Sequence, residues 1–427
     1  MKTLLILTEK CLSGISLSSL RESSDNLRII LAVSERLYDT FQDADGFDAV
    51  FYIQETLDSN EIFKVLDLGR LEAIVGSEIK LLVDRSANKN DMFIYCADEA
   101  NVLIAAQLRK KFSLSGAHHE NVLHFRDKLL MKRTASRFKI NIPIFFELDV
   151  DELFNNEKKY YLNLKYLLDG KFVLKPTDSA GSFGIFIINS YQDFKCFSLR
   201  FKTLSEAFKV KYIVEEFISG KLFHIDTVTC EKKIIFSEAS EYLYPNFDFQ
   251  NGKILSSIRL PEDNSVKNRL IKFVEKLLIA FGLPEGAQHT EVFISRKTQD
   301  IVFLETSARP PGMFVNQMYQ KSTGVSIPML EIVSQLQLNI KIGNNVQNLM
   351  PTFWAVLPKP AGVVTELVPP KLPSHFDIEW FVFLGEKIHA TRSNLDFSAK
   401  IMVADIDELS LRKSFELLRN FRGIFVK

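Results

Sequence analysis

The sequence of 427 residues lacks a net charge, a cysteine framework and a long apolar run. Its 53 lysines and arginines balance 53 aspartates and glutamates, so no overall field attracts nucleic acid or an anionic membrane. The four cysteines form no CxxC pair and no metal-ligand spacing, which indicates free thiols in a reducing compartment. They are Cys11, Cys96, Cys196 and Cys230. We therefore expect any anion site to be local and expect no nucleic-acid partner.

No stretch approaches the roughly 18 apolar residues that a membrane span requires. The first residues, MKTLLILTEK, begin with a short apolar run that ends at Thr8. A secretory signal needs about 7–15 apolar residues, so this run predicts a first buried strand. We expect a cytoplasmic protein without a membrane partner.

The first 120 residues alternate short apolar runs with amphipathic stretches, which is typical of a parallel α/β sheet. The turn after the first run reads TEKCLSG and lacks GxGxxG, so the dinucleotide-binding class has little support. Residues 99–112 have helical periodicity. The predicted strands are Leu4–Leu7, Leu27–Val33, Ala49–Ile53, Ala73–Val75 and Met92–Cys96.

The rest of the chain predicts two further domains, so the fold class is α/β and α+β multidomain. We expect an N-terminal α/β domain at 1–120, a second domain at 121–345 and a small α+β domain at 346–427. Helices are predicted at 126–139, 264–281, 322–338 and 406–419, and strands at 171–175, 184–188 and 211–217.

Two alternating segments, 289–295 and 301–307, flank a polar five-residue turn and predict a β-hairpin. Pairing Ser295 with Ile301 sets Phe293 opposite Phe303, Glu291 opposite Glu305 and His289 opposite Ser307, all on one side of the sheet. Like charges so placed, with Cβ atoms roughly 4.5–5.5 Å apart, repel each other unless a cation compensates. Mg²⁺ is such a cation, since it is held by one or two carboxylates plus phosphates. The alternative is an exposed hairpin with two solvated acids.

Residues 171–188 read as a strand, a Lys-Pro, a glycine-bearing loop and a second strand. Gly181 and Gly184 flank Ser182, and glycine lets main-chain N–H groups approach phosphate oxygens. Lys175 at the strand end adds a mobile positive charge. A tight hairpin with a surface lysine is the alternative.

Lys128 opens a basic helix, where a cation and the positive helix end together favour a phosphate. The alternative is a solvated basic face formed with Arg126, Lys132 and Arg133.

Arg309 follows the second hairpin strand, and its guanidinium suits a carboxylate or phosphoryl group in bidentate geometry. A structural salt bridge is the alternative. Upstream, the apolar strand at 212–220, YIVEEFISG, offers a main-chain edge and an apolar slot for an adenine.

In order and spacing, these segments resemble the ATP-grasp superfamily. The segments are DK at 127–128, VLKPTDSAGSFGI at 173–185, VEEFISG at 214–220, HTEVF at 289–293 and LETSARPPG at 304–312. The C-terminal region, with AGVV at 361–364, resembles the amino-acid ligase branch, which makes dipeptides and related amides.

The resemblance implies an ATP-grasp domain at 121–345 with a small nucleotide lobe at about 140–212. A nucleotide would be held between two lobes, with ATP and Mg²⁺ or Mn²⁺ as cofactors. Lys128 and Lys175 would contact the phosphates, and Arg309 would hold the substrate or an acyl-phosphate. The remaining implied sets are a closing loop of Ser179, Gly181, Ser182 and Gly184; an adenine site of Glu215 with the main chain of Glu216, Phe217 and Ile218; and metal ligands Glu291 and Glu305.

Two positions depart from the family pattern. Leu222 stands where the family often has a ribose-binding glutamate, so His224 or Asp226 would substitute or the ribose would be held loosely. Ser307 stands where the family has a metal-binding asparagine. A hydroxyl can still ligate Mg²⁺, with a weaker or more hydrated second metal.

The implied reaction activates a carboxylate as an acyl-phosphate and joins it to an amine, with small-molecule substrates and a homodimer by analogy. His289 would accept a proton from the amine, or serve as a hydrogen-bonded structural histidine. Two other functions stay open: a ligase that uses a thiol or another nucleophile, and a catalytically weak ATP-binding regulatory protein.

Overall fold

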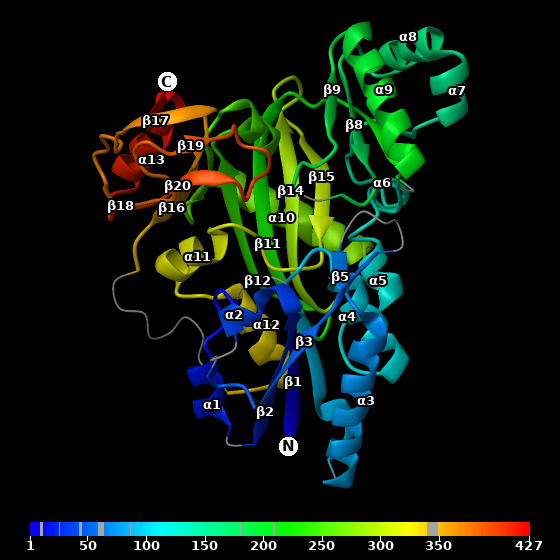
Figure 1. The fold of residues 1–427 in the computed structure, drawn as a ribbon, viewed down its shortest axis with the longest axis vertical. Coiled ribbons are helices and arrows are strands. Elements are labelled where there is room, and N and C mark those ends of the chain that lie inside the picture. Colours follow the sequence, from blue (N-terminus) through cyan, green and yellow to red (C-terminus); the bar gives the residue numbers. More distant parts are fainter. Residues whose placement is uncertain are drawn as a thin grey trace.

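The computed structural model describes residues 1–8, 12–24, 26–41, 45–58, 64–85, 87–179, 181–207, 210–339 and 349–427. Cys11 and part of the predicted turn after the first strand lie outside the described residues. The chain forms a parallel sheet, a small lobe with its own sheet, and a long antiparallel sheet between them that continues into the C-terminal region (Figure 1). The predicted mixture of α/β and α+β parts is therefore confirmed. The domain division at 120 and 345 stays a prediction.

The N-terminal sheet is parallel in the order β3-β2-β1-β6 and is covered on both faces. Leu5, Leu7 and Ile30 pack against helices on one face. Leu4 and Ile6 face the other way, against residues of α1 and α12. Burial on both faces explains the continuous apolar runs in the sequence. The elements are β1 (Lys2–Thr8), β2 (Leu27–Ser34), β3 (Ala49–Ile53), β6 (Met92–Cys96), α1 (Leu17–Ser23), α3 (Leu68–Asp84), α4 (Val102–Phe112) and α12 (Ile327–Leu336).

The strand predicted at Ala73–Val75 is wrong, because these residues lie inside α3. Asp67 caps this helix by accepting a hydrogen bond from the Arg70 N–H. The buried residues of α3 follow helical spacing, which a three-residue apolar run cannot reveal. They are Leu71, Ile74, Val75, Glu78 and Leu82.

The small lobe has a four-stranded sheet in the order β7-β10-β8-β9, with helices packed beside it (Figure 1). Its core is aromatic: Phe194 is fully buried and lies within 5.7–6.2 Å, centroid to centroid, of four other rings. The predicted strands at 171–175 and 211–217 are confirmed. The elements are β7 (Phe145–Glu147), β8 (Phe172–Pro176), β9 (Phe186–Ile188), β10 (Tyr212–Glu216), α7 (Val150–Asn155), α8 (Glu157–Leu167) and α9 (Tyr191–Ala207).

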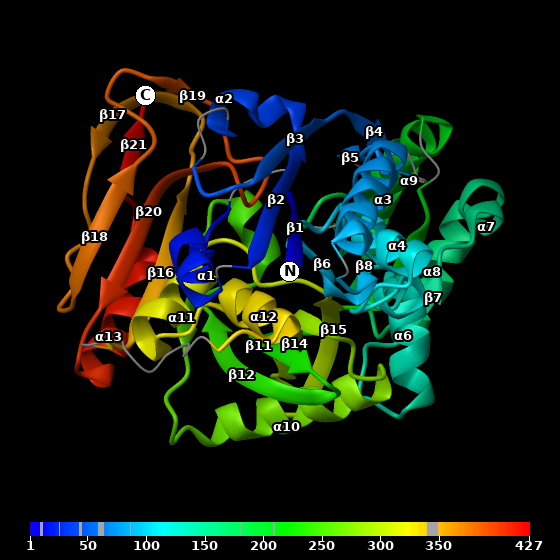
Figure 2. The same cartoon turned by 90° about the horizontal axis from the view of Figure 1, so that it is seen from below.

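The central sheet has eight strands in the order β15-β14-β11-β12-β13-β16-β20-β18. Helix α10 lies along one face, where Leu270, Val274 and Leu277 pack on the sheet (Figure 2). Residues of α11 and α12 pack on the opposite face. The elements are β11 (Gly220–Cys230), β12 (Lys233–Tyr242), β13 (Leu255–Arg259), β14 (Gly286–Ser295), β15 (Ile301–Ser307), β16 (Thr352–Pro358), β18 (His375–Trp380), β20 (Phe397–Ala404), α10 (Ser265–Ala280) and α11 (Val315–Thr323).

The single helix predicted at 322–338 is two helices, α11 and α12. Gly324 ends α11 with φ of +75°, and the Ser326 side chain caps α12 by accepting from the Met329 N–H. Strands β16, β20 and β18 belong to the same sheet as the hairpin, so the C-terminal region is joined to it by main-chain hydrogen bonds.

The remaining elements connect these layers. They are α2 (Tyr38–Phe41), α5 (His119–Leu123), α6 (Lys128–Arg137), α13 (Glu408–Leu417), β4 (Glu55–Leu57), β5 (Lys64–Leu66), β17 (Gly362–Leu367), β19 (Lys387–Ile388), β21 (Ile424–Val426) and the short 3₁₀ helices η1 (Glu35–Leu37), η2 (Lys89–Asp91), η3 (Asn246–Asn251) and η4 (Leu418–Asn420). Among the described residues, no helix is both long enough and apolar enough to cross a membrane.

The aromatic core of the small lobe predicts a large loss of stability for Phe194→Ala. Removing a fully buried ring from such a cluster costs about 3–5 kcal/mol of unfolding free energy, measured by urea denaturation. The matched control is Tyr166→Ala on α8 in the same lobe, where the side chain is 86% exposed and the expected change is within about 0.5 kcal/mol. Equal losses for the two variants would contradict this view of the lobe.

Candidate active site

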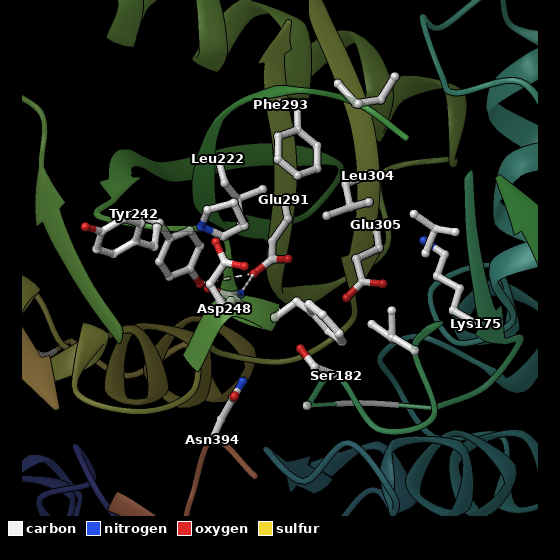
Figure 3. Close-up of a pocket in the computed structure, with 18 of the residues that line it drawn as sticks. Lys175, Ser182, Leu222, Tyr242, Asp248, Glu291, Phe293, Leu304, Glu305 and Asn394 are labelled. Atoms are coloured by element: carbon white, nitrogen blue, oxygen red, sulfur yellow. Dashed lines mark hydrogen bonds between the residues drawn. The ribbon is translucent and has the colours of Figure 1, made fainter. Parts of the chain in front are cut away.

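The hairpin of β14 and β15 brings Glu291 and Glu305 directly opposite each other, as predicted, and His289 opposite Ser307. The other two predicted pairs are wrong, because a β-bulge at Leu304 shifts the register beyond the glutamates. Phe303 is consequently buried in the core beneath α10 and does not share the face of Glu305. Leu304 turns to the glutamate face in its place and lines a cavity (Figure 3).

This cavity has a volume of about 790 Å³ and lies where the small lobe, the central sheet and the N-terminal part meet. Figure 3 shows Glu291 and Glu305 side by side on neighbouring strands, with Lys175 on one side and Tyr242 on the other. The wall holds every predicted phosphate-facing residue except Gly184, together with both glutamates, Ser307 and Arg309. Residues far apart in the sequence therefore converge on one volume large enough for a nucleotide and a small substrate.

Glu291 is buried, and its neighbours fix the direction of its carboxylate. Tyr242 and Asn246 donate hydrogen bonds of 3.1 and 2.7 Å to Oε1, and His289 Nε2 lies 3.5 Å from the same oxygen. Burial alone would raise the pKa of Glu291, but the hydrogen bond and charge of His289 lower it. All these contacts converge on Oε1, so within the described parts of the chain Oε2 is available for another ligand.

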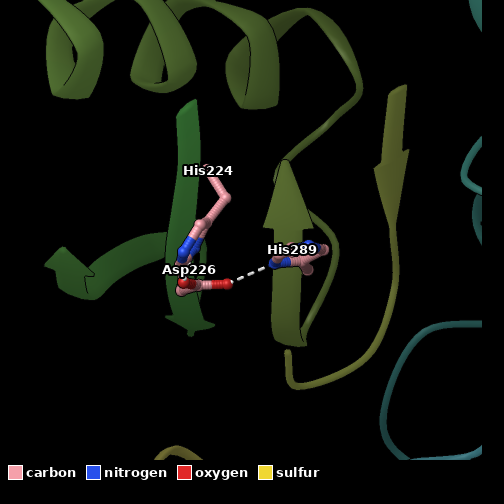
Figure 4. Close-up of side chains that lie close together, drawn as sticks. All are labelled: His224, Asp226 and His289. Atoms are coloured by element: carbon pink, nitrogen blue, oxygen red, sulfur yellow. Dashed lines mark hydrogen bonds and ion pairs between the residues drawn. The ribbon is translucent and has the colours of Figure 1, made fainter. Parts of the chain in front are cut away.

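His289 is itself held by a buried layer of polar side chains (Figure 4). Asp226 Oδ1 lies 2.6 Å from His289 Nδ1, and Asp226 Oδ2 lies 2.7 Å from His224 Nδ1 and accepts from the Tyr319 hydroxyl at 2.8 Å. The ligand atoms of the two histidines and the aspartate lie within 4.8 Å of one another, as a metal site would require. In this arrangement they already satisfy one another by hydrogen bonds, so the cluster orients His289.

This layer bears on two predicted roles: a ribose contact by Asp226 or His224, and proton transfer by His289. Asp226 and His224 are fully buried behind the cavity wall, and their polar atoms already have hydrogen-bond partners. They therefore do not replace the ribose-binding residue. Burial would lower the pKa of His289, but the Asp226 carboxylate raises it to about 9. A pKa of about 9 favours the charged imidazolium at neutral pH, and with the Asp226 contact it supports the alternative of a hydrogen-bonded structural histidine.

The second glutamate, Glu305, is partly exposed to the cavity and lies 3.6 Å from Lys128 Nζ. Ser307 Oγ is buried, lines the cavity and has no hydrogen-bond partner among the described residues. Two opposed carboxylates and an unpartnered hydroxyl are oxygen donors of the kind that Mg²⁺ prefers. The donor set therefore fits a Mg²⁺ ion at Glu291, Glu305 and Ser307.

The basic helix α6 is not a solvated face, because Lys128 and Lys132 lie one turn apart on its buried side. Lys128 donates to the main-chain oxygen of Ser179 at 2.5 Å, which ties the helix to the glycine-bearing loop. Of the basic residues grouped with Lys128 in the sequence, Arg126 is also buried, and Arg133 forms an exposed ion pair.

Lys132 fixes the bulge in the hairpin. Its Nζ donates to the main-chain oxygens of Phe303 and Leu304 at 2.9 and 2.7 Å. The same Nζ lies 3.4 Å from Glu215, whose other oxygen lies 2.7 Å from Lys175 Nζ. Burial lowers the pKa of Lys132 to about 8 although Glu215 opposes this shift. One buried network thus joins α6, the bulge and two strands of the small lobe.

Glu215 therefore has a role different from the predicted one. It is 2% exposed, and its carboxylate pairs with the two lysines, so the side chain does not read an adenine. Burial alone would lower the pKa of Lys175, but Glu215, with Glu305 and Glu291 further away, raises it above its ordinary value. Lys175 is held as a cation at the cavity wall.

The loop after Lys175 has the backbone expected of an anion-binding turn. Gly181, Ser182 and Gly184 all have positive φ, of 63°, 62° and 72°. A Cβ at Gly184 would come within 2.7 Å of the Pro176 ring, so glycine is required there. The structure brings this loop beside Lys128 through the Ser179 contact.

The hinge between the small lobe and the central sheet is the segment 216–218. Its main-chain hydrogen bonds limit which of its N–H groups could bind an adenine. The N–H groups of Glu216 and Phe217 already donate to the main-chain oxygens of Ile144 and Lys171. Ile218 lines the cavity, and its N–H has no main-chain partner among the described residues. The Lys171 ammonium lies 3.7 Å from the centre of the Phe217 ring and covers it.

Arg309 joins the N-terminal part to the cavity. Its Nε donates to Glu99, which precedes α4, and a second guanidinium nitrogen donates to the Pro310 carbonyl. Burial alone would raise the pKa of Glu99, but Arg309 and Arg126 lower it to about 2. The salt bridge that the sequence left open is present, and Arg309 still lines the cavity.

Several residues of the site were not found from the sequence. Tyr242, Asn246, Asp248, Trp354 and Asn394 all line the cavity from segments without a recognisable motif. Asn246 Oδ1, Asn394 Oδ1 and Trp354 Nε1 are buried and lack hydrogen-bond partners among the described residues. Unpartnered polar atoms of this kind are explained by a bound ligand or water. For Lys132, the i+4 spacing from Lys128 was the available signal.

Comparison with known families agrees with this geometry. Residues 168–316 match the family model of the ATP-grasp domain. The chain is 24% identical over 237 residues to an L-arginine-specific L-amino acid ligase of Bacillus subtilis. That alignment covers 55% of each protein, so it spans about half the length of this curated relative.

Solved structures extend the likeness of fold to the whole chain. The L-amino acid ligase from Bacillus licheniformis superposes with a TM-score of 0.70 and 13% identity, covering 100% of this chain and 99% of that one. The N5-carboxyaminoimidazole ribonucleotide synthetase from Thermotoga maritima gives 0.62 and 15%, with complete coverage of both chains. The biotin carboxylase domain of the Hydrogenobacter thermophilus 2-oxoglutarate carboxylase, solved as a dimer with MgADP, gives 0.62 and 13%. It covers 99% of this chain and 91% of that one. Residues 168–316 therefore match the ATP-grasp domain, and the chain as a whole shares its fold with these solved structures.

Proposed function

We propose that the protein is an ATP-dependent carboxylate-amine ligase that forms an amide, with an amino acid as one of its substrates. The observation that carries this proposal is the meeting of Glu291, Glu305, Lys128 and Lys175 in one cavity beside the glycine-bearing loop. The likeness to two L-amino acid ligases supports the amino-acid substrate. ATP and Mg²⁺ are the proposed cofactors, as in the neighbour solved with MgADP.

In the first step, a substrate carboxylate oxygen attacks the γ-phosphorus of ATP and ADP leaves, giving an acyl-phosphate. Negative charge builds on the phosphoryl oxygens, and Lys128 and Lys175 face that charge as fixed cations. A Mg²⁺ ion held by Glu291, Glu305 and Ser307 would supply further neutralisation of these oxygens. Because Glu215 and Lys132 hold Lys175 and the bulge in place, little reorganisation is needed during the reaction.

In the second step, the amine nitrogen attacks the acyl carbon, phosphate leaves and the amine loses a proton. Water must be excluded, since it would hydrolyse the acyl-phosphate. The loop at 181–184 lies at the cavity wall, where its closure would exclude water. Arg309, oriented by Glu99, is placed to hold a carboxylate or the acyl-phosphate.

A cytoplasmic location and a homodimer are two further proposals. Cys96, Cys196 and Cys230 are free thiols, as is usual for cytoplasmic proteins. A homodimer rests on analogy with the neighbour solved as a dimer, and light scattering on the purified protein would test it.

The test of the proposed function is ADP release with Mg-ATP and pooled amino acids, together with mass analysis of the products. ADP that depends on a particular pair, with a product equal to the sum of their masses minus water, would establish the ligase. A thioester mass would instead assign a thiol nucleophile. ATP binding without ADP release in any pool would favour a regulatory ATP-binding protein.

Substitution of the second metal ligand should stop turnover without unfolding the protein. Glu305→Gln keeps the shape of the side chain but removes its charge, so ATP turnover should fall by at least about 100-fold. The circular-dichroism spectrum should stay unchanged. Glu275→Gln on the exposed side of α10 is the control and should keep full turnover. Near-normal turnover of Glu305→Gln would show that the metal assignment is wrong.

Loss of the lysine that fixes the bulge should affect both stability and turnover. Lys132→Met removes the donor to the carbonyls of Phe303 and Leu304, and each buried group left without a partner costs roughly 1–3 kcal/mol. We expect a loss of about 2 kcal/mol or more in urea denaturation, with reduced turnover because Glu305 follows the bulge. Lys276→Met, on the exposed side of α10, is the control. A variant as stable and active as the wild type would refute this role.

A further inference from the structure

Six carboxylates line the cavity, and five of them have partners. Glu99 pairs with Arg309, Glu215 with two lysines, and Glu305 with Lys128. Glu291 accepts from Tyr242 and Asn246, and Glu216 accepts from the Ile144 N–H at 3.3 Å. The sixth, Asp248, is partly buried, and its carboxylate has no hydrogen bond or ion pair among the described residues. Its side chain reaches into the cavity (Figure 3).

Asp248 belongs to η3, which spans two ends of the cavity. At one end Asn246 donates to Glu291, in the proposed metal site. At the other end Asp248 lies within electrostatic range of Lys171, whose ammonium covers the Phe217 ring at the hinge. The ribose of a nucleotide lies between its base and its phosphates. A base at the hinge and phosphates at the metal site would therefore place the ribose beside η3.

The main chain holds Asp248 in this position. Its N–H donates to the Pro245 carbonyl, and its carbonyl accepts from the Lys253 N–H at 3.1 Å. Burial raises the pKa of Asp248, while Lys253 and Lys171 partly offset the effect, so a ligand that donates to the carboxylate would relieve a desolvated charge.

The two carboxylates of β10, at the hinge, already have partners, since Glu215 pairs with two lysines and Glu216 accepts from the Ile144 N–H. Leu222 is apolar and 2% exposed, and Asp226 and His224 are behind the wall. The 2′- and 3′-hydroxyls of a ribose are two adjacent donors, and a carboxylate can accept from both. We propose that Asp248 binds the ribose of the nucleotide, accepting hydrogen bonds from its 2′- and 3′-hydroxyls. This assignment rests on the proposed function, because it requires a nucleotide in the cavity.

The test compares ADP with 2′,3′-dideoxy-ADP by isothermal titration calorimetry in the presence of Mg²⁺. Hydrogen bonds to a charged group contribute about 1.5–3 kcal/mol, so the wild type should bind ADP about 10- to 100-fold more tightly than the dideoxy analogue. In Asp248→Ala the two affinities should become nearly equal. Because both nucleotides carry the same phosphates, the ratio of the two affinities cancels any general effect of the lost charge on phosphate binding.

Two further variants keep the result interpretable. Asp248→Asn keeps the size of the side chain and one acceptor oxygen, so its ratio should fall between those of the wild type and Asp248→Ala. Asp263→Ala removes an exposed aspartate outside the cavity wall and should keep the wild-type ratio. Their melting temperatures should match that of the wild type.

The outcomes separate this inference from the proposed function. If ADP binds and Asp248→Ala keeps the wild-type preference for ADP over the dideoxy analogue, Asp248 does not bind ribose, while the ligase proposal stands. If the wild type binds neither nucleotide, both are overturned.

Discussion

The opposition of two carboxylates on the hairpin of β14 and β15 is the constraint around which the site is built. Glu291 and Glu305 face each other across the pair of strands, an arrangement that repels unless cations balance it. The protein surrounds the pair with positive charge: protonated His289 beside Glu291, and Lys128 beside Glu305. Among the described residues, one oxygen of Glu291 and the Ser307 hydroxyl have no hydrogen-bond partner, so both stay available to a cation.

Buried ionic networks connect this hairpin to the other parts of the chain. Lys132 reaches from α6 to the bulge carbonyls and to Glu215 of the small lobe, so the bulge and the hinge strand share one cation. On the other side, Arg309 reaches Glu99 of the N-terminal part. Removing one member of such a pair leaves an uncompensated buried charge, which is strongly destabilising. The networks therefore set the relative positions of the phosphate-facing, metal-facing and substrate-facing groups.

The hairpin, its pair of glutamates and the glycine-bearing loop could be predicted from the sequence, because each depends on a local residue pattern. Alternation and the polar turn predicted the hairpin and the pairing of Glu291 with Glu305, and glycine spacing predicted the loop. The bulge could not be predicted, since it depends on Lys132, 172 residues away from Leu304 in the sequence. A ribose contact was wrongly assigned to Asp226, because the sequence does not show that His224, His289 and Tyr319 already hydrogen-bond its carboxylate. Asp248 lies in a short 3₁₀ helix with no motif, and the hydrogen bond from Asn246 of that helix to Glu291 places the helix beside the proposed metal site.

We propose that the bulged hairpin forms a metal site shared by two opposed carboxylates. Titration of Mn²⁺ in the presence of ADP, followed by electron paramagnetic resonance, measures this directly. We expect Glu291→Gln and Glu305→Gln each to weaken Mn²⁺ binding by about tenfold or more, with wild-type affinity in Asp263→Ala. If both glutamate variants bound Mn²⁺ as tightly as the wild type, the hairpin would not be the metal site.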